Sequence, residues 1–205
     1  MPGIKLALLA LAQAANTPPA STVYFPPDYA TPSVSCHYGP RTLTIAIVSD
    51  FEAKWYGSQL AAAQEPSLYQ TARVPGTTLR FTWLRTFHPP VVVRVEGLGT
   101  ASPRLVAKQL TGAGGYDPGR IGKHIERPLT QGEARDVAAL VTRTDPFRMS
   151  PVSCDSGFDG AEWLVEGVDD KGYHFVGRWS PERGPFHDLG LAMLALTGWT
   201  FAPIY

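Results

Sequence analysis

The sequence lacks the biases and motifs that most directly indicate a function. Among 205 residues, 18 Lys and Arg balance 18 Asp and Glu, so no excess positive charge draws the chain to nucleic acid. The calcium-loop pattern DxDxDG, the nucleophile context GxSxG and the phosphate-loop ending GK[ST] are all missing. We therefore predict no metal, no cofactor and no nucleic-acid partner.

Long hydrophobic runs are also missing, and none reaches the length of a membrane-spanning helix. The short apolar run at residues 6–11 follows Lys5 and precedes Ala12-Gln13-Ala14, a small-x-small cleavage pattern. This arrangement predicts a signal peptide over residues 1–15, cleaved near Ala14 or Ala15, and a periplasmic or secreted mature protein. The alternatives are a buried first helix or a translation-start artefact.

Cysteine is scarce, with only Cys36 and Cys154 in the chain. Export places both residues in an oxidising compartment, and a pair with none left over predicts one disulfide. A thiolate metal site that adds His37 is the weaker alternative, because no CxxC or HxxxH spacing accompanies it. A nucleophilic cysteine would have to escape pairing.

The composition divides the remaining chain into two parts. Residues 16–40 are rich in Pro, Ser and Thr, which predicts an extended segment that packs through Tyr24 and Phe25. Residues 41–205 predict a single α+β domain, in which an antiparallel sheet of about five to six strands packs on two to three helices. The expected strands are 43–48, 79–83, 91–96, 104–110, 162–168 and 173–179.

Three helices follow from local signals. Ser49 or Asp50 can cap a helix to about residue 64, with Phe51, Trp55 and Ala62 on one face. Thr130-Gln131-Gly132-Glu133 is a capping box that begins a second helix, which Asp145-Pro146 ends. Gly184-Pro185 begins a third, mostly buried helix. Its C-terminal neighbours should fold back as a hydrophobic clasp: Trp199, Phe201, Ile204 and Tyr205.

Residues 162–179 are predicted to form a hairpin with its turn at 169–172. The expected pairs are Gly167 with His174, Val165 with Val176 and Trp163 with Arg178. One face then holds Leu164, Glu166, Tyr173, Phe175 and Trp179, and its bulk leads us to expect that it meets the core. The other face should stay solvated, with Arg178 in cation–π contact with Trp163 worth about 0.5–1 kcal/mol.

Two functional hypotheses remain. The first is a non-enzymatic binding or inhibitor-like module of the cell envelope, which presents Trp163, His174 and Arg178 to a protein or envelope ligand. The second is a small periplasmic hydrolase that uses Asp159 or Glu166 with His174 for general acid–base chemistry. The polar residues that cluster in this stretch are Asp155, Asp159, Glu162, Glu166, His174 and Arg178.

Several short patterns carry a resemblance to known proteins. They are GGYDPG at residues 114–119, the capping box at Thr130, DGAEW at 159–163 and YHFVGRWSP at 173–181. With this spacing the chain resembles an uncharacterised family of small secreted bacterial proteins, over roughly residues 78–199. The resemblance implies export and one compact module, and it implies no activity and no catalytic residues.

Overall fold

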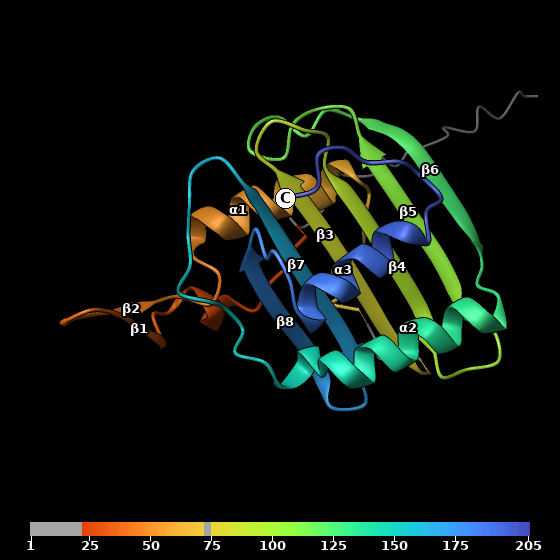
Figure 1. Ribbon diagram of the computed structural model, residues 1–205, viewed down its shortest axis with the longest axis horizontal. Helices are drawn as coiled ribbons and strands as arrows, with labels where there is room; N and C mark the ends of the chain where they lie inside the picture. The colour runs from red at the N-terminus through yellow and green to blue at the C-terminus, as the bar shows by residue number, and fades with distance from the viewer. Residues whose placement is uncertain (1–21, 72–74) are drawn as a thin grey trace, which may run out of the picture.

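The computed structural model describes residues 22–71 and 75–205 and has an α+β fold (Figure 1). The predicted signal peptide, residues 1–15, lies outside these residues. The described helices are α1 Asp50–Ala62, α2 Gln131–Thr144 and α3 Pro185–Ala195, with 3₁₀ turns η1 Pro27–Ala30 and η2 Pro146–Arg148. The described strands are β1 Val34–Tyr38, β2 Arg41–Ile45, β3 Thr77–Arg85, β4 Val91–Leu98, β5 Arg104–Leu110, β6 Ile121–Pro128, β7 Ala161–Asp169 and β8 Gly172–Trp179.

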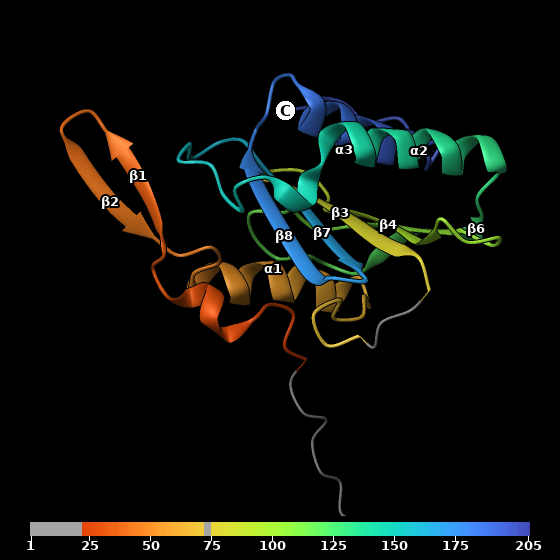
Figure 2. The same cartoon turned by 90° about the horizontal axis from the view of Figure 1, so that it is seen from below.

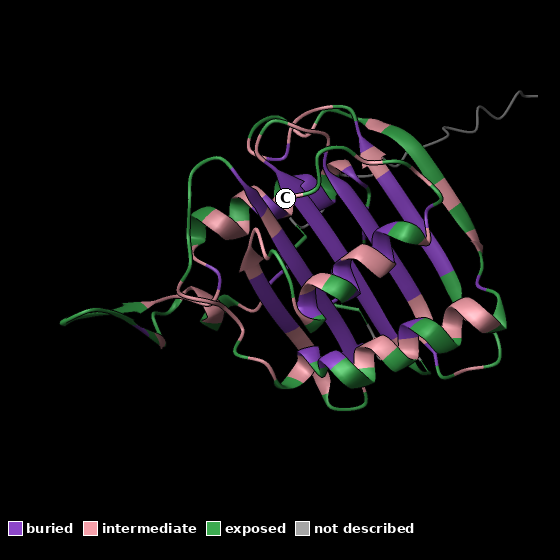
Figure 3. Ribbon diagram, viewed as in Figure 1, coloured by how far each residue is buried: buried purple, intermediate pink, exposed green. Residues whose placement is uncertain are grey.

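The main sheet is antiparallel throughout, with six strands in the order β6-β5-β4-β3-β7-β8. This confirms the predicted fold class and the approximate strand count. β1 and β2 pair separately as a hairpin that projects from the body (Figure 2). Neither β1 nor β6 was predicted. β1 lies in the Pro-rich segment that predicted extended chain, and β6 is largely exposed and has only Ile121 and Ile125 as large apolar residues (Figure 3).

Helices cover both faces of the sheet (Figure 2). α2 and α3 lie over a core that includes Phe81, Trp83 and Trp163. α1 lies on the other face, where Leu60 packs with a second core around Leu164. Strand β3 is therefore buried along almost its whole length, whereas its alternating pattern predicted a half-buried strand.

The β7–β8 hairpin has the predicted register, with Gly167 opposite His174 and Trp163 opposite Arg178. The prediction that the Trp163 face is solvated is wrong. Trp163 is fully buried, because Gly190 of α3 leaves room for its ring: a Cβ atom on Gly190 would lie 2.3 Å from Trp163 Cζ3. The opposite face also packs as predicted, and Leu164 lies in the second core.

The helix starts agree with their sequence signals. Ser49 caps α1 and Thr130 caps α2, each through a complete capping box. The predicted face of α1 is correct in part: Trp55 and Ala62 pack, partly buried, against the second core, although the fully buried residues are Tyr56, Gln59 and Leu60. Phe51, which was expected on the packed face, is 73% exposed.

Two long-range ties close the fold. Cys36 and Cys154 form the predicted disulfide. At the C-terminus, the indole nitrogens of Trp83 and Trp163 donate hydrogen bonds of 3.1 and 2.9 Å to the main-chain carbonyl of Tyr205. The predicted C-terminal clasp therefore acts through the backbone of Tyr205 as well as through Phe201, which packs edge-on against Trp83.

Candidate functional site

The three residues predicted to bind a partner do not share an exposed surface. Trp163 is buried beneath α3. Arg178 donates hydrogen bonds to the carbonyls of Gly177 and Ser150, and its guanidinium lies 5.5 Å from the Phe186 ring instead of over Trp163. His174 is partly buried against Phe147, with ring centroids 4.4 Å apart. Binding of a partner by His174 or Arg178 stays a prediction. The three residues do not form one binding face together.

The carboxylate partners proposed for His174 lie elsewhere. Glu166 faces the α1 side of the sheet, where its carboxylate binds Arg80. Asp159 lies in the exposed loop before β7. His174 Nε2 instead lies 3.0 Å from Asp169 Oδ1. Burial alone would raise the pKa of Asp169, but hydrogen bonds from His174 and from the turn amides hold that pKa below its usual value. The Asp169–His174 pair thus links the two strands beside the β7–β8 turn.

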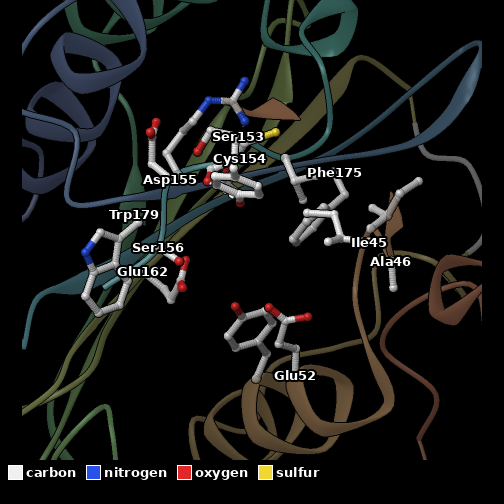
Figure 4. Close-up of a pocket in the computed structure, with 16 residues that line it drawn as sticks. Ile45, Ala46, Glu52, Ser153, Cys154, Asp155, Ser156, Glu162, Phe175 and Trp179 are labelled. Atoms are coloured by element: carbon white, nitrogen blue, oxygen red, sulfur yellow. Dashed lines mark hydrogen bonds between the residues drawn. The ribbon is translucent and has the colours of Figure 1, made fainter. Parts of the chain in front are cut away.

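A different group of polar residues surrounds a cavity of about 200 Å³ (Figure 4). The β1–β2 hairpin, the start of α1, the segment 152–156 and strands β7 and β8 form its walls. Three carboxylates line it, and two of them, Glu52 of α1 and Glu162 of β7, belong to regular elements; we call it the carboxylate cavity. The other polar or aromatic side chains that line it are Tyr38, Tyr56, Ser153, Asp155, Ser156, Phe175, Arg178 and Trp179.

Glu162 is the most unusual residue of the cavity. It lies near the start of β7 and, by strand alternation, on the same face as Leu164 and Glu166. Among the described residues, none donates a hydrogen bond to its carboxylate or lies within ion-pair distance of it. Burial, and next the negative charge of Glu52, raise the pKa of Glu162 from 4.5 to about 7. The carboxyl group therefore titrates near neutral pH.

Glu52 is held in place by the helix that carries it. Its Oε2 accepts hydrogen bonds of 2.7 Å from both the backbone nitrogen and the hydroxyl of Ser49, which closes the capping box of α1. One turn further along, burial and the charges of Glu162 and Glu52 raise the pKa of Tyr56 well above 10, as does a hydrogen bond to Glu52. Tyr56 is consequently a neutral hydrogen-bonding group at the cavity wall.

The remaining walls are fixed by long-range contacts. The disulfide joins β1 to Cys154, and the Tyr38 hydroxyl donates a 2.7 Å hydrogen bond to the Cys154 carbonyl. Gly157 lies against Trp179 so closely that a Cβ atom there would be 2.4 Å from the indole nitrogen. The hairpin and the loop therefore form a defined cavity in the folded chain.

Asp155, Glu162 and Arg178, three of the polar residues that the sequence indicated, do line this cavity. Sequence reasoning missed Glu52, because its visible signature is that of a capping box and capping explains it without a ligand. Within residues 22–71 and 75–205, no group of three or more His, Cys, Asp or Glu residues is placed to hold a metal ion. The same residues contain no helix long and apolar enough to cross a membrane.

No protein-family model matches the sequence, and a search of curated proteins returns no match. An unpaired carboxyl group that titrates near pH 7 can bind a cation in its ionised form or donate a proton in its neutral form.

Proposed function

We propose that the chain is an exported, non-enzymatic binding module. In this proposal the carboxylate cavity binds a protonated amine or guanidinium group of an envelope protein or ligand. The observation that carries the proposal is Glu162, whose carboxylate lacks a partner although it is largely withdrawn from water. Because a buried charge is costly without a partner, a cationic ligand would supply the missing interaction.

The disulfide supports export, because disulfides persist mainly in oxidising compartments. A periplasmic or secreted location, reached by cleavage near Ala14 or Ala15, is part of the proposal. So is membership of the uncharacterised family of small secreted bacterial proteins that the sequence resembles. Both fit a module that meets its ligand outside the cytoplasm.

The test is a calorimetric titration with Nα-acetyl-lysine amide at pH 7.5, with Nα-acetyl-norleucine amide as the neutral analogue of similar shape. The lysine derivative should bind, and the variant Glu162→Gln should weaken its binding at least tenfold because the charge pair is lost. Glu182→Gln, an exposed substitution outside the cavity, is the matched control and should bind normally. Equal binding of both compounds would refute cation recognition.

Proton release offers a second readout. A cation favours the ionised form of Glu162, so binding at pH 6.5 should release protons and lower its pKa. Affinity should fall about tenfold per pH unit once the pH is well below 7. Titrations in buffers of different ionisation enthalpy measure the released protons, and a release that persists in Glu162→Gln would contradict the assignment.

A hydrolase is the second candidate, and the raised pKa of Glu162 favours it. A carboxyl group that is partly protonated near pH 7 is a suitable general acid, and Glu52 would be the second carboxylate. This differs from the carboxylate–histidine pair that the sequence indicated, because the cavity lining contains no histidine. Turnover of chromogenic glycosides that is lost in Glu162→Gln would favour this candidate over the binding module.

A further inference from the structure

Four large aromatic side chains are exposed at one end of the main sheet. Phe51, Phe87, Tyr116 and Phe158 are 73%, 58%, 64% and 96% exposed, and we call them the aromatic surface. Exposed apolar residues are ordinary when scattered, but a group of large ones in one region is typical of an interaction site.

Contacts between loops bring these residues together from distant parts of the chain. Phe87 and Tyr116 stack with their ring centroids 6.2 Å apart, and Phe51 lies 6.0 Å from Trp55. The indole nitrogen of Trp55 donates a 2.6 Å hydrogen bond to Gly114, next to the Tyr116 loop. The hydroxyl of Thr86 donates to the carbonyl of Gly160 at 3.0 Å, beside the Phe158 loop.

The loops beneath the aromatic surface are closely packed. A Cβ atom on Gly114 would lie 2.7 Å from the Arg85 carbonyl, and one on Gly115 would lie 2.9 Å from the Thr86 carbonyl. The backbone nitrogen of Gly115 also donates to Thr86 at 3.1 Å. Such packing positions the rings before a partner arrives, which reduces the entropy lost on binding.

The aromatic surface and the carboxylate cavity share two segments of the chain. Helix α1 contributes Phe51 to the surface and Glu52 to the cavity. The loop before β7 contributes Phe158 to the surface, while Ser156 lines the cavity (Figure 4). The two groups of residues are therefore held close together by α1 and by the loop before β7.

The charges near the aromatic surface indicate the chemistry of its ligand. Four exposed carboxylates lie on the same segments as the aromatic residues: Asp50, Asp117, Asp155 and Asp159. Among the described residues, none of the four is within ion-pair distance of a basic side chain. Lys54 and Arg120 are the exposed basic residues nearest to them in sequence, and the charge of Arg178, which lines the cavity, interacts with Asp155. The other three carboxylates still leave an excess of negative charge on these segments. This imbalance favours a basic partner and opposes an anionic bilayer.

We infer that the cavity and the aromatic surface together bind a basic peptide segment of a partner protein. One Lys or Arg side chain of the segment enters the carboxylate cavity, and neighbouring apolar side chains pack on the aromatic surface. This inference rests on the proposed function, since the cavity provides the cationic anchor site. It adds the partner class and a second group of binding residues.

The probe is a displayed library of nine-residue peptides with a central Lys or Arg and randomised flanks. Selection should enrich aromatic and large aliphatic residues beside the basic one. A selected peptide, synthesised and titrated by fluorescence anisotropy, should bind at least tenfold more tightly than Nα-acetyl-lysine amide. The double variant Phe87→Ala/Phe158→Ala should remove that gain and leave binding of the lysine derivative unchanged. Tyr69→Ala, which removes an exposed aromatic residue outside the surface, is the control.

The outcomes separate the two proposals. If the lysine derivative binds but no peptide binds more tightly, the partner inference fails and the cation site stands. If neither binds, both fail. If the double variant instead abolishes binding to phosphatidylcholine vesicles or a dimer seen by sedimentation, the surface has a different occupant and the peptide inference is wrong.

Discussion

Glu162 and Glu166 lie on the same face of strand β7 and have opposite surroundings. Glu166 is fully buried and accepts two hydrogen bonds from Arg80, at 2.9 and 2.7 Å, and one from the Tyr173 hydroxyl at 2.9 Å. Glu162 lies at the cavity end of the strand and has no such partner among the described residues. The same strand thus carries one compensated and one uncompensated carboxylate.

Glu65 shows that the protein ordinarily provides cations for its buried carboxylates. Its oxygens bind Arg94 and Lys108 at 2.7 Å each, and Arg80 lies 3.8 Å away. Burial raises the pKa of Glu65, but these cations more than offset it and hold the pKa below 4.5. Arg178 also lines the cavity, but its guanidinium donates to the carbonyls of Gly177 and Ser150, and among the described residues no cation is within ion-pair distance of Glu162. Burial therefore raises the pKa of Glu162. The missing cation is therefore a local property of the cavity, and it is what a ligand would supply.

The largest expected effect comes from breaking the compensated pair. Arg80→Met leaves Glu166 buried without its guanidinium, and we expect the free energy of unfolding to fall by about 3–5 kcal/mol. The double variant Arg80→Met/Glu166→Leu removes both charges and should lose less than the single variant. Urea unfolding at pH 7 measures both. A double variant less stable than the single one would show that uncompensated charge is not the cause.

The disulfide should stabilise the cavity end of the molecule. Cys36→Ser/Cys154→Ser removes a tie across 118 residues, and we expect a loss of about 2–4 kcal/mol under oxidising conditions. The β1–β2 hairpin forms part of the cavity wall, so amide hydrogen exchange should accelerate there more than around Arg80. Wild-type protein with a reductant should behave like the variant. If amide hydrogen exchange accelerated equally around Arg80, the disulfide would not act locally at the cavity end of the molecule.

Glu162→Gln should raise stability, in contrast to Arg80→Met. Between pH 4.5 and about 7 the folded state retains a proton on Glu162 that the unfolded state has lost. The free energy of unfolding of the wild type therefore falls as the pH rises through this window and levels off above pH 7. Glu162→Gln has no carboxyl group to titrate at this position, so its stability does not fall in this window. At pH 8 it should be more stable than the wild type by about 1–3 kcal/mol, and at pH 4 it should not be.

Thermal unfolding across pH measures this difference, with Glu182→Gln as the exposed control. A stability gain at pH 8 together with lost ligand binding is the expected mark of a residue retained for function. An equal effect of Glu162→Gln at pH 4 and pH 8 would show that the carboxyl group does not titrate in this window.

The sequence predicted those features that depend on neighbours along the chain. The β7–β8 register followed from the turn and strand alternation, and the starts of α1 and α2 followed from Ser49 and Thr130. The burial of Trp163 did not follow, since it depends on Gly190 and on where α3 packs. The Arg80–Glu166 pair joins residues 86 positions apart, and the prediction left that pairing of β3 with β7 undefined.

The smallest expected effect concerns the third partner of Glu166. Tyr173→Phe removes only the hydroxyl that donates to Glu166 Oε1, while Arg80 still compensates the charge. We expect a loss of about 1.5 kcal/mol, the low end of the usual range for a hydrogen bond to a charged group, because Arg80 still pairs with Glu166. In the Arg80→Met background Tyr173 is the remaining hydrogen-bond donor to Glu166, so the same substitution should cost more there. A double-mutant cycle measured by urea unfolding gives this coupling. Purely additive effects would mean that the Tyr173 hydroxyl acts independently of the Arg80 charge and contributes nothing to the compensation of Glu166.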